Sequence, residues 1–198
     1  MVNGIRFHSF KAASRANGPG LRCVVWFQGC TLNCGGCGNP ETHQPDPEKF
    51  KSVSDVKNLI LDAYKKHHIE GITFSGGEPL QQAEALIELM LFANSLGLSV
   101  IISTGYTFDE IAKMNKRINY AISHFSDVVI AGRYDNTQHI GTGFRGSANK
   151  EYRFFSEFYH ESDFRKITPF EIEINPETFE IELTGVGLNP QKLEEILT

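Results

Sequence analysis

The chain has 198 residues, of which 40% are hydrophobic and 22% are charged, and this size and composition predict one globular domain over residues 1–198. The formal net charge of −5 argues against binding to a nucleic-acid backbone, which requires a basic surface. No apolar run approaches the roughly 18 residues that span a membrane, and the N-terminus does not resemble a secretory signal. We therefore expect a cytoplasmic protein without a nucleic-acid or membrane partner.

Strand-like and helix-like segments alternate through residue 131. Apolar or β-branched runs predict strands over residues 5–10, 21–27, 71–74, 98–102 and 127–133. Helical spacing predicts a helix from Ser52 or Ser54, a second with Pro79 in its first turn and Gly97 at its end, and a short third over 108–114. Such alternation is typical of a parallel sheet with right-handed crossovers.

The predicted fold class is α/β, with an incomplete, open parallel β/α barrel and a C-terminal β-hairpin. A complete eight-unit barrel typically needs about 250 residues, more than this chain has. Period-two alternation over 170–174 and 179–183 predicts the hairpin, with glutamates along one face. We expect that acidic face to be solvated, and a partner-docking surface is the alternative. A short helix is expected over 190–197.

Three cysteines, Cys30, Cys34 and Cys37, lie within eight residues as C-x₃-C-x₂-C. Three thiolates at such short spacing can hold an iron–sulfur cluster and leave one iron open to a ligand. A zinc site would need a fourth ligand, Cys23 or His43. A disulfide framework is disfavoured in a chain of this length without a secretory signal. Cys23 lies inside an apolar strand, and we expect it to be a core residue.

A second motif, Ser-Gly-Gly-Glu-Pro-Leu at 75–80, follows the strand predicted over 71–74. Its glycines allow a close approach of the backbone to a ligand, and Glu78 supplies a carboxylate that could hold an ammonium group. Taken alone, the segment is an ordinary strand–turn–helix junction. Its position at the end of a predicted parallel strand places it where open α/β folds bind ligands.

Together these segments resemble the radical S-adenosylmethionine enzymes, especially the activating enzymes of glycyl-radical enzymes and, among these, that of anaerobic ribonucleotide reductase. The resemblance covers most of the chain. It is carried by residues 18–22, 27–42, 75–80, 103–106, 145–149 (Arg-Gly-Ser-Ala-Asn) and 183–185. Ala131 and Ala148 depart from the family pattern, in which Asp and Ser are common at these positions.

The resemblance implies a [4Fe-4S] cluster and S-adenosyl-L-methionine as cofactors. It assigns the cluster to Cys30, Cys34 and Cys37. It assigns cofactor binding to Gly36, Cys37, Gly38, Gly76, Gly77, Glu78, Pro79, Ser103 and Thr104. No residue is assigned as a catalytic acid, base or nucleophile.

The implied activity is reductive cleavage of S-adenosylmethionine to a 5′-deoxyadenosyl radical, which abstracts hydrogen from a glycine of a partner such as anaerobic ribonucleotide reductase. With no further cysteine cluster, the electron is expected from a flavodoxin or ferredoxin. Two alternatives stay open. One is a radical S-adenosylmethionine enzyme acting on another peptide or a small molecule, and the other is a non-enzymatic zinc or iron–sulfur interaction module.

Overall fold

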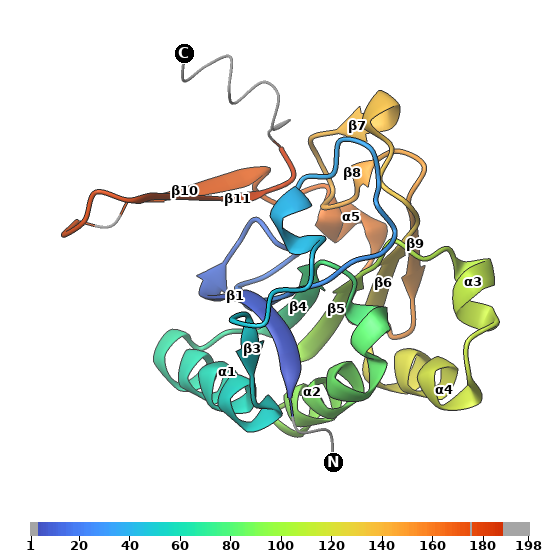
Figure 1. The fold of residues 1–198 in the computed structure, drawn as a ribbon, viewed down its shortest axis with the longest axis horizontal. Helices are drawn as coiled ribbons and strands as arrows, with labels where there is room; N and C mark the ends of the chain where they lie inside the picture. Colours follow the sequence, from blue (N-terminus) through green and yellow to red (C-terminus); the bar gives the residue numbers. More distant parts are fainter. Residues whose placement is uncertain (1–3, 175, 188–198) are drawn as a thin grey trace.

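The computed structural model describes residues 4–174 and 176–187, and the helix predicted over 190–197 lies outside them. Its main feature is a seven-stranded sheet with the order β3-β1-β2-β4-β5-β6-β9 (Figure 1). The strands of this sheet are β1 (Ile5–Ser14), β2 (Arg22–Phe27), β3 (Phe50–Lys51), β4 (Gly71–Gly76), β5 (Ser99–Ser103), β6 (Val128–Ala131) and β9 (Glu151–Phe154).

The four middle strands form the predicted parallel sheet. β2 pairs parallel with β4, β4 with β5, and β5 with β6. The crossovers run through α1 (Val53–His67), α2 (Ala83–Ser95) and the pair α3 (Phe108–Ala112) and α4 (Lys116–Phe125). Since parallel strands end at the same edge, the loops after β2, β4, β5 and β6 share one side of the molecule.

The outer strands are antiparallel, which the sequence analysis did not predict. β1 pairs antiparallel with both β2 and β3, and β9 pairs antiparallel with β6. The connection between β1 and β2 spans only residues 15–21, too short for the crossover that a parallel pair requires. β3 and β9 are the two ends of the sheet, so within the described ranges the strands do not close into a barrel.

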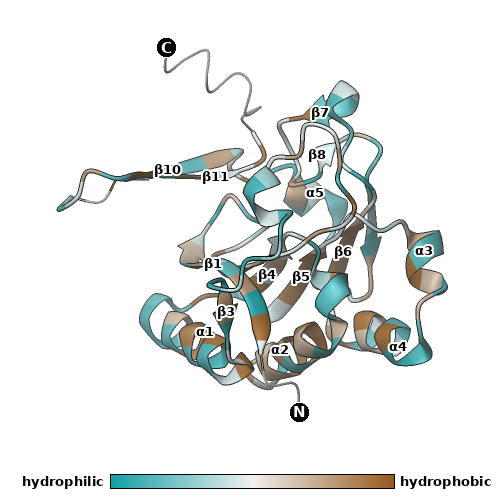
Figure 2. Cartoon of the chain, viewed as in Figure 1, coloured by the Kyte–Doolittle hydropathy of each residue, from teal (hydrophilic) through white to brown (hydrophobic). Residues whose placement is uncertain are grey.

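Helices α1, α2 and α4 pack on one side of the sheet, and the loop that carries the cysteines runs on the other side (Figure 1). Figure 2 shows hydrophobic residues along β4, β5 and β6, and hydrophilic residues on the outer surface of α1. Ser52 caps α1 by accepting a hydrogen bond from the Asp55 amide at 3.0 Å, as predicted. Gly97, with φ of 73°, follows the end of α2 and confirms the predicted stop.

Several short elements were not predicted: α4, β3, β9, β7 (His139–Ile140), β8 (Gly146–Ser147) and α5 (Glu161–Phe164). α4 carries apolar residues at helical spacing, namely Ile118, Ile122 and Phe125. Only three residues separate it from α3. No helix in the described part of the chain is long and apolar enough to cross a membrane.

The predicted hairpin is present as β10 (Phe170–Ile174) and β11 (Ile181–Gly185), which projects from the body of the molecule (Figure 1). The glutamates of its acidic face are largely exposed, as expected, and they also contact β1. Glu173 and Glu182 both pair with Lys11 of β1, at 2.5 and 3.2 Å. The glutamates face β1 because they compensate this lysine, whose side chain is only 8% exposed.

The opposite face of the hairpin is apolar. It is formed by Phe170, Ile172, Ile174, Ile181 and Leu183, of which Leu183 is half-buried and the other four are exposed. Ile172 and Ile181 are 58% and 67% exposed. At Ile172, Ile174 and Ile181, apolar side chains therefore face solvent while glutamates of the other face contact β1, the reverse of the usual amphipathic arrangement.

Candidate functional site

The cysteine loop leaves the carboxyl end of β2 and is fixed by a second segment of the chain. The amide of Gly29 donates to the carbonyl of Thr42 at 2.7 Å, and the amide of Cys30 donates to that of His43 at 3.0 Å. The side-chain amide of Gln28 also donates to two carbonyls beyond the cysteines, in the 41–44 segment. Residues 28–43 therefore form a loop that is closed at its base before any ligand binds.

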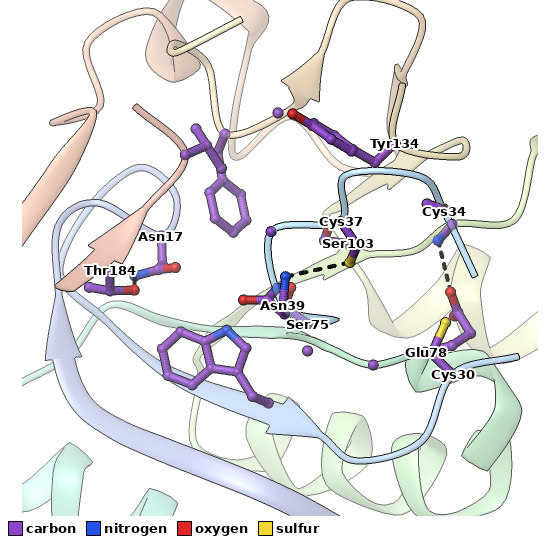
Figure 3. Close-up of a pocket in the computed structure, with 18 of the residues that line it drawn as sticks. Asn17, Cys30, Cys34, Cys37, Asn39, Ser75, Glu78, Ser103, Tyr134 and Thr184 are labelled. Atoms are coloured by element: carbon purple, nitrogen blue, oxygen red, sulfur yellow. Dashed lines mark hydrogen bonds between the residues drawn. The ribbon is translucent and has the colours of Figure 1, made fainter. Parts of the chain in front are cut away.

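All three loop cysteines line one cavity of about 560 Å³ at the carboxyl ends of the parallel strands (Figure 3). None of the three is in a disulfide, and each side chain is half-buried. A volume of this size is typical of sites for small-molecule cofactors. Within residues 4–174 and 176–187, no group of three His, Cys, Asp or Glu side chains converges as it would on a single metal ion.

Cys23 lies in the core, as predicted. Its side chain is fully buried among the residues that pack under α1 and α2, and burial raises the pKa of its thiol to about 12. Burial also raises the pKa of the Cys30 and Cys37 thiols, which favours their protonated forms. A metal cluster would bind them as thiolates and release those protons.

The Gly76–Gly77 segment meets the backbone of the cysteine loop. The amide of Gly77 donates to the carbonyl of Phe27 at 2.7 Å, and that of Glu78 donates to the carbonyl of Gly29 at 3.0 Å. A Cβ atom at Gly77 would lie 2.5 Å from the Gly29 carbonyl oxygen. These glycines are predicted to make room for a ligand, and their immediate neighbour in the structure is the base of the cysteine loop.

Glu78 is fully buried, and its carboxylate accepts three hydrogen bonds from the protein. The donors are the Leu80 amide at 2.9 Å, the Thr104 hydroxyl at 2.8 Å and the Gly105 amide at 2.8 Å. Burial raises the pKa of this carboxyl group, and the hydrogen bonds oppose that change. Glu78 thus joins the loop after β4 to the loop after β5, and its predicted ammonium-binding role stays a prediction.

The remaining predicted cofactor residues divide into two groups. Gly38, Gly76, Gly77, Ser103 and Thr104 line the cavity with the cysteines and Glu78. Of the described residues, Gly36 and Pro79 do not line it. Pro79 opens the buried 3₁₀ turn Pro79–Gln82, and Gly36, with φ of 69°, lies against Asn136.

The structure adds wall residues that the sequence analysis did not single out. Trp26, Tyr134, Asn17, Thr184 and Lys150 all line the cavity. Figure 3 shows Tyr134 on one side and Asn17 with Thr184 on another, and the Asn17 side-chain amide donates to the Thr184 hydroxyl at 2.9 Å. Thr184 belongs to the 183–185 segment, whose resemblance to the family was the only signal for it.

Comparisons with known proteins agree with this geometry. A family model described as a 4Fe-4S single cluster domain matches residues 16–153. The pyruvate formate-lyase-activating enzyme of Clostridium pasteurianum is 37% identical over 133 residues, which are 64% of this chain and 56% of the relative. That of Staphylococcus epidermidis is 34% identical over 155 residues, 71% of this chain and 57% of the relative.

The chain spans about half the length of these curated relatives. Among solved structures, QueE from Escherichia coli matches with a TM-score of 0.37 and 17% identity, over 53% of each chain. The three thiols on one wall of a cofactor-sized cavity are a donor set that fits an iron–sulfur cluster. A [4Fe-4S] cluster and S-adenosylmethionine are the cofactors of this site.

Proposed function

Because the chain belongs to the 4Fe-4S single cluster domain family, we propose that it is a radical S-adenosylmethionine enzyme that activates a partner glycyl-radical enzyme. The observation that supports this most is the cavity itself. The thiols of Cys30, Cys34 and Cys37 line it together with Gly76, Gly77 and Glu78 of the second motif. Segments more than thirty residues apart in sequence are joined there by backbone hydrogen bonds.

Cys30, Cys34 and Cys37 would hold the cluster, and the residues after β4 and β5 would hold the cofactor. When bound, the cluster and S-adenosylmethionine supply one-electron cleavage of the sulfonium and so a 5′-deoxyadenosyl radical. The part of the protein is to place the reacting groups and to limit access of water. Glu78 contributes by fixing the Thr104–Gly105 backbone at the cavity wall.

The proposed substrate is a glycine Cα–H of a glycyl-radical enzyme. The radical takes the hydrogen atom and becomes 5′-deoxyadenosine, and the glycine keeps the unpaired electron. The relatives reported above are named as activating enzymes of pyruvate formate-lyase. The residues of this chain resemble the activase of anaerobic ribonucleotide reductase, and we propose that reductase as the first candidate partner.

The electron for cofactor cleavage would come from a flavodoxin or ferredoxin. The chain has four cysteines, three of which form the proposed cluster site, and the fourth, Cys23, is buried in the core. The described residues therefore leave no thiols for a second iron–sulfur cluster that could relay electrons within the chain.

The test is anaerobic incubation of the reconstituted protein with S-adenosylmethionine, reduced flavodoxin and each candidate partner in turn. An activase gives a doublet glycyl-radical EPR signal in the partner, and a partner labelled with deuterated glycine transfers deuterium to 5′-deoxyadenosine. If no glycyl-radical enzyme gives the doublet, and a peptide or small molecule supplies the hydrogen, the activase assignment fails. Cofactor cleavage without any partner would still distinguish an enzyme from a binding module.

A further inference from the structure

Lys150 places a buried positive charge at the wall of the cluster cavity. The residue is 8% exposed and lines the cavity together with Cys34, Cys37 and Ser103. Its ammonium group donates to the Ser103 hydroxyl at 3.4 Å, a long hydrogen bond to a neutral acceptor. Among the residues that the structure describes, it has no ion-pair partner.

A buried ammonium without a carboxylate partner is costly, since burial penalises the charged form. Burial lowers the pKa of Lys150, and the charges of Glu78, Cys34 and Cys37 oppose that change. Glu78 does not neutralise it by contact, because its two oxygens are engaged by Leu80, Thr104 and Gly105. An anion in the cavity would compensate the charge of Lys150.

The backbone around Lys150 holds the side chain in this position. The Asn149 side-chain amide donates to the carbonyl of Arg133 at 2.8 Å, which anchors the segment just beyond β6. Gly132, with φ of 123°, lies beside the Lys150 backbone, and a Cβ there would contact its Cα at 3.4 Å. The lysine stem thus passes over a glycine whose conformation suits few other residues.

A second cation from the same segment also borders the cavity. Arg145 lines it, and its guanidinium lies 5.1 Å from the centre of the Tyr152 ring. The Arg145 Nε atom is buried and has no hydrogen-bond partner among the described residues. Segment 145–150 therefore presents one buried ammonium and one incompletely bonded guanidinium to a site that also contains three thiols.

We propose that Lys150 binds the α-carboxylate of S-adenosylmethionine, with the Ser103 hydroxyl beside it. The carboxylate is the one anionic group of that cofactor, and Ser103, the last residue of β5, lines the cavity (Figure 3). A carboxylate here would replace the single long hydrogen bond of Lys150 with a charge-assisted one. Lys150 would then be a cofactor-positioning residue contributed by the 145–150 segment.

The test measures cofactor binding by the cluster-loaded protein, without a partner enzyme. Equilibrium dialysis compares S-adenosylmethionine with decarboxylated S-adenosylmethionine for the wild type, Lys150→Met, Lys150→Gln and the control Lys57→Met. Lys57 is a half-buried lysine of α1 that pairs with Glu88, away from the cavity. Iron content and the melting temperature of each apo variant establish that cluster and fold are retained.

We expect Lys150→Met and Lys150→Gln to raise the dissociation constant of S-adenosylmethionine at least about 30-fold, the loss usual for one partner of a buried charge pair. The dissociation constant of the decarboxylated analogue should rise less than about threefold in these variants, because the analogue lacks the group that Lys150 recognises. The apo variants should melt at the wild-type temperature or above, since an unpaired buried charge has been removed.

Unchanged affinity for S-adenosylmethionine in both variants would overturn the proposal, and so would an equal loss of affinity for the two ligands. A lower melting temperature of both apo variants would assign Lys150 a structural role instead. Because binding is measured without a glycyl-radical enzyme, none of these outcomes depends on whether the activase function is correct.

Discussion

The hydroxyl of Thr104 donates to the carboxylate of Glu78 at 2.8 Å, with both side chains buried. The same carboxylate accepts from the amides of Leu80 and Gly105. One side chain thus ties the first turn after β4 to the loop after β5. The two walls of the cavity cannot separate while these three hydrogen bonds are kept.

Replacing Glu78 with Ala should therefore weaken the fold as well as the site. Three donors would lose their acceptor in a buried environment, and we expect a loss of roughly 2–4 kcal/mol in the free energy of unfolding. Denaturant titration of the apo protein measures it. The matched control is Glu84→Ala, an exposed glutamate of α2 in a surface pair with Arg117, which should change stability by less than about 1 kcal/mol. Equal small changes in both variants would show that the Glu78 network contributes little.

A methyl group at Gly77 should disturb the cysteine loop. The added Cβ would lie 2.5 Å from the carbonyl oxygen of Gly29, so one of the two backbones must move. We expect Gly77→Ala to lose about 1–3 kcal/mol of stability and to bind less iron on reconstitution. Gly35→Ala is the control, because a Cβ there meets nothing within 4 Å. If Gly77→Ala kept wild-type melting and iron content, the contact between the two motifs would not be needed to place the cysteines.

The sequence predicted the parts of this fold in which local pattern and burial agree. The apolar runs of β2, β4, β5 and β6 are buried strands, and Ser52 begins α1 where capping chemistry predicted it. The antiparallel pairing of β1 was not predicted, because the pattern of apolar and polar residues along a strand does not indicate which strand it pairs with. Pairing there is decided by the short connection to β2.

The candidate site also contains residues that a local sequence motif predicts and residues that only the folded structure brings to it. The cysteines and the Gly-Gly-Glu motif are local signals, and the structure brings them to one cavity. Lys150 and Thr184 reach that cavity through long-range packing, so no local pattern marks Lys150, and only the family resemblance of residues 183–185 marks Thr184. The ion pairs between the acidic face of the hairpin and Lys11 were not predicted, because Lys11 lies more than 150 residues from Glu173 in sequence and close to it in space.

Each loop cysteine should be required for the cluster, and Cys23 should not be. Ala at position 30, 34 or 37 removes a thiol from the cavity wall, and we expect each variant to lose the four-iron Mössbauer signal after reconstitution. Cys23→Ala should keep that signal, because its thiol is buried in the core. It should cost about 1 kcal/mol of stability for the small cavity it leaves. Loss of the signal in Cys23→Ala at unchanged stability would indicate a different ligand set.

The position of the β10–β11 hairpin should depend on pH through Lys11. The hydrogen bond from Lys11 holds the pKa of Glu173 below its ordinary value. For Lys11 itself, burial lowers the pKa, but the bonds and charges of Glu173 and Glu182 outweigh this and raise it above its ordinary value. A lowered carboxyl pKa gives stability that is complete above pH 4.5 and is lost as pH falls. A raised lysine pKa gives stability that is complete below pH 10.5 and is lost as pH rises.

We therefore expect hydrogen exchange of residues 170–185, corrected for intrinsic rates, to be slowest between these limits and faster at pH 3. At pH 7, the hairpin amides of Lys11→Met should exchange as fast as those of the wild type do at pH 3. We expect this increase in rate to be a factor of a few, since the solvent-exposed glutamates limit the ion pairs to about 1 kcal/mol. Lys66→Met, at the exposed end of α1, is the control and should keep the wild-type pH profile. Exchange of the hairpin that is equally fast at pH 3 and pH 7 in the wild type would mean that Lys11 does not hold it against β1.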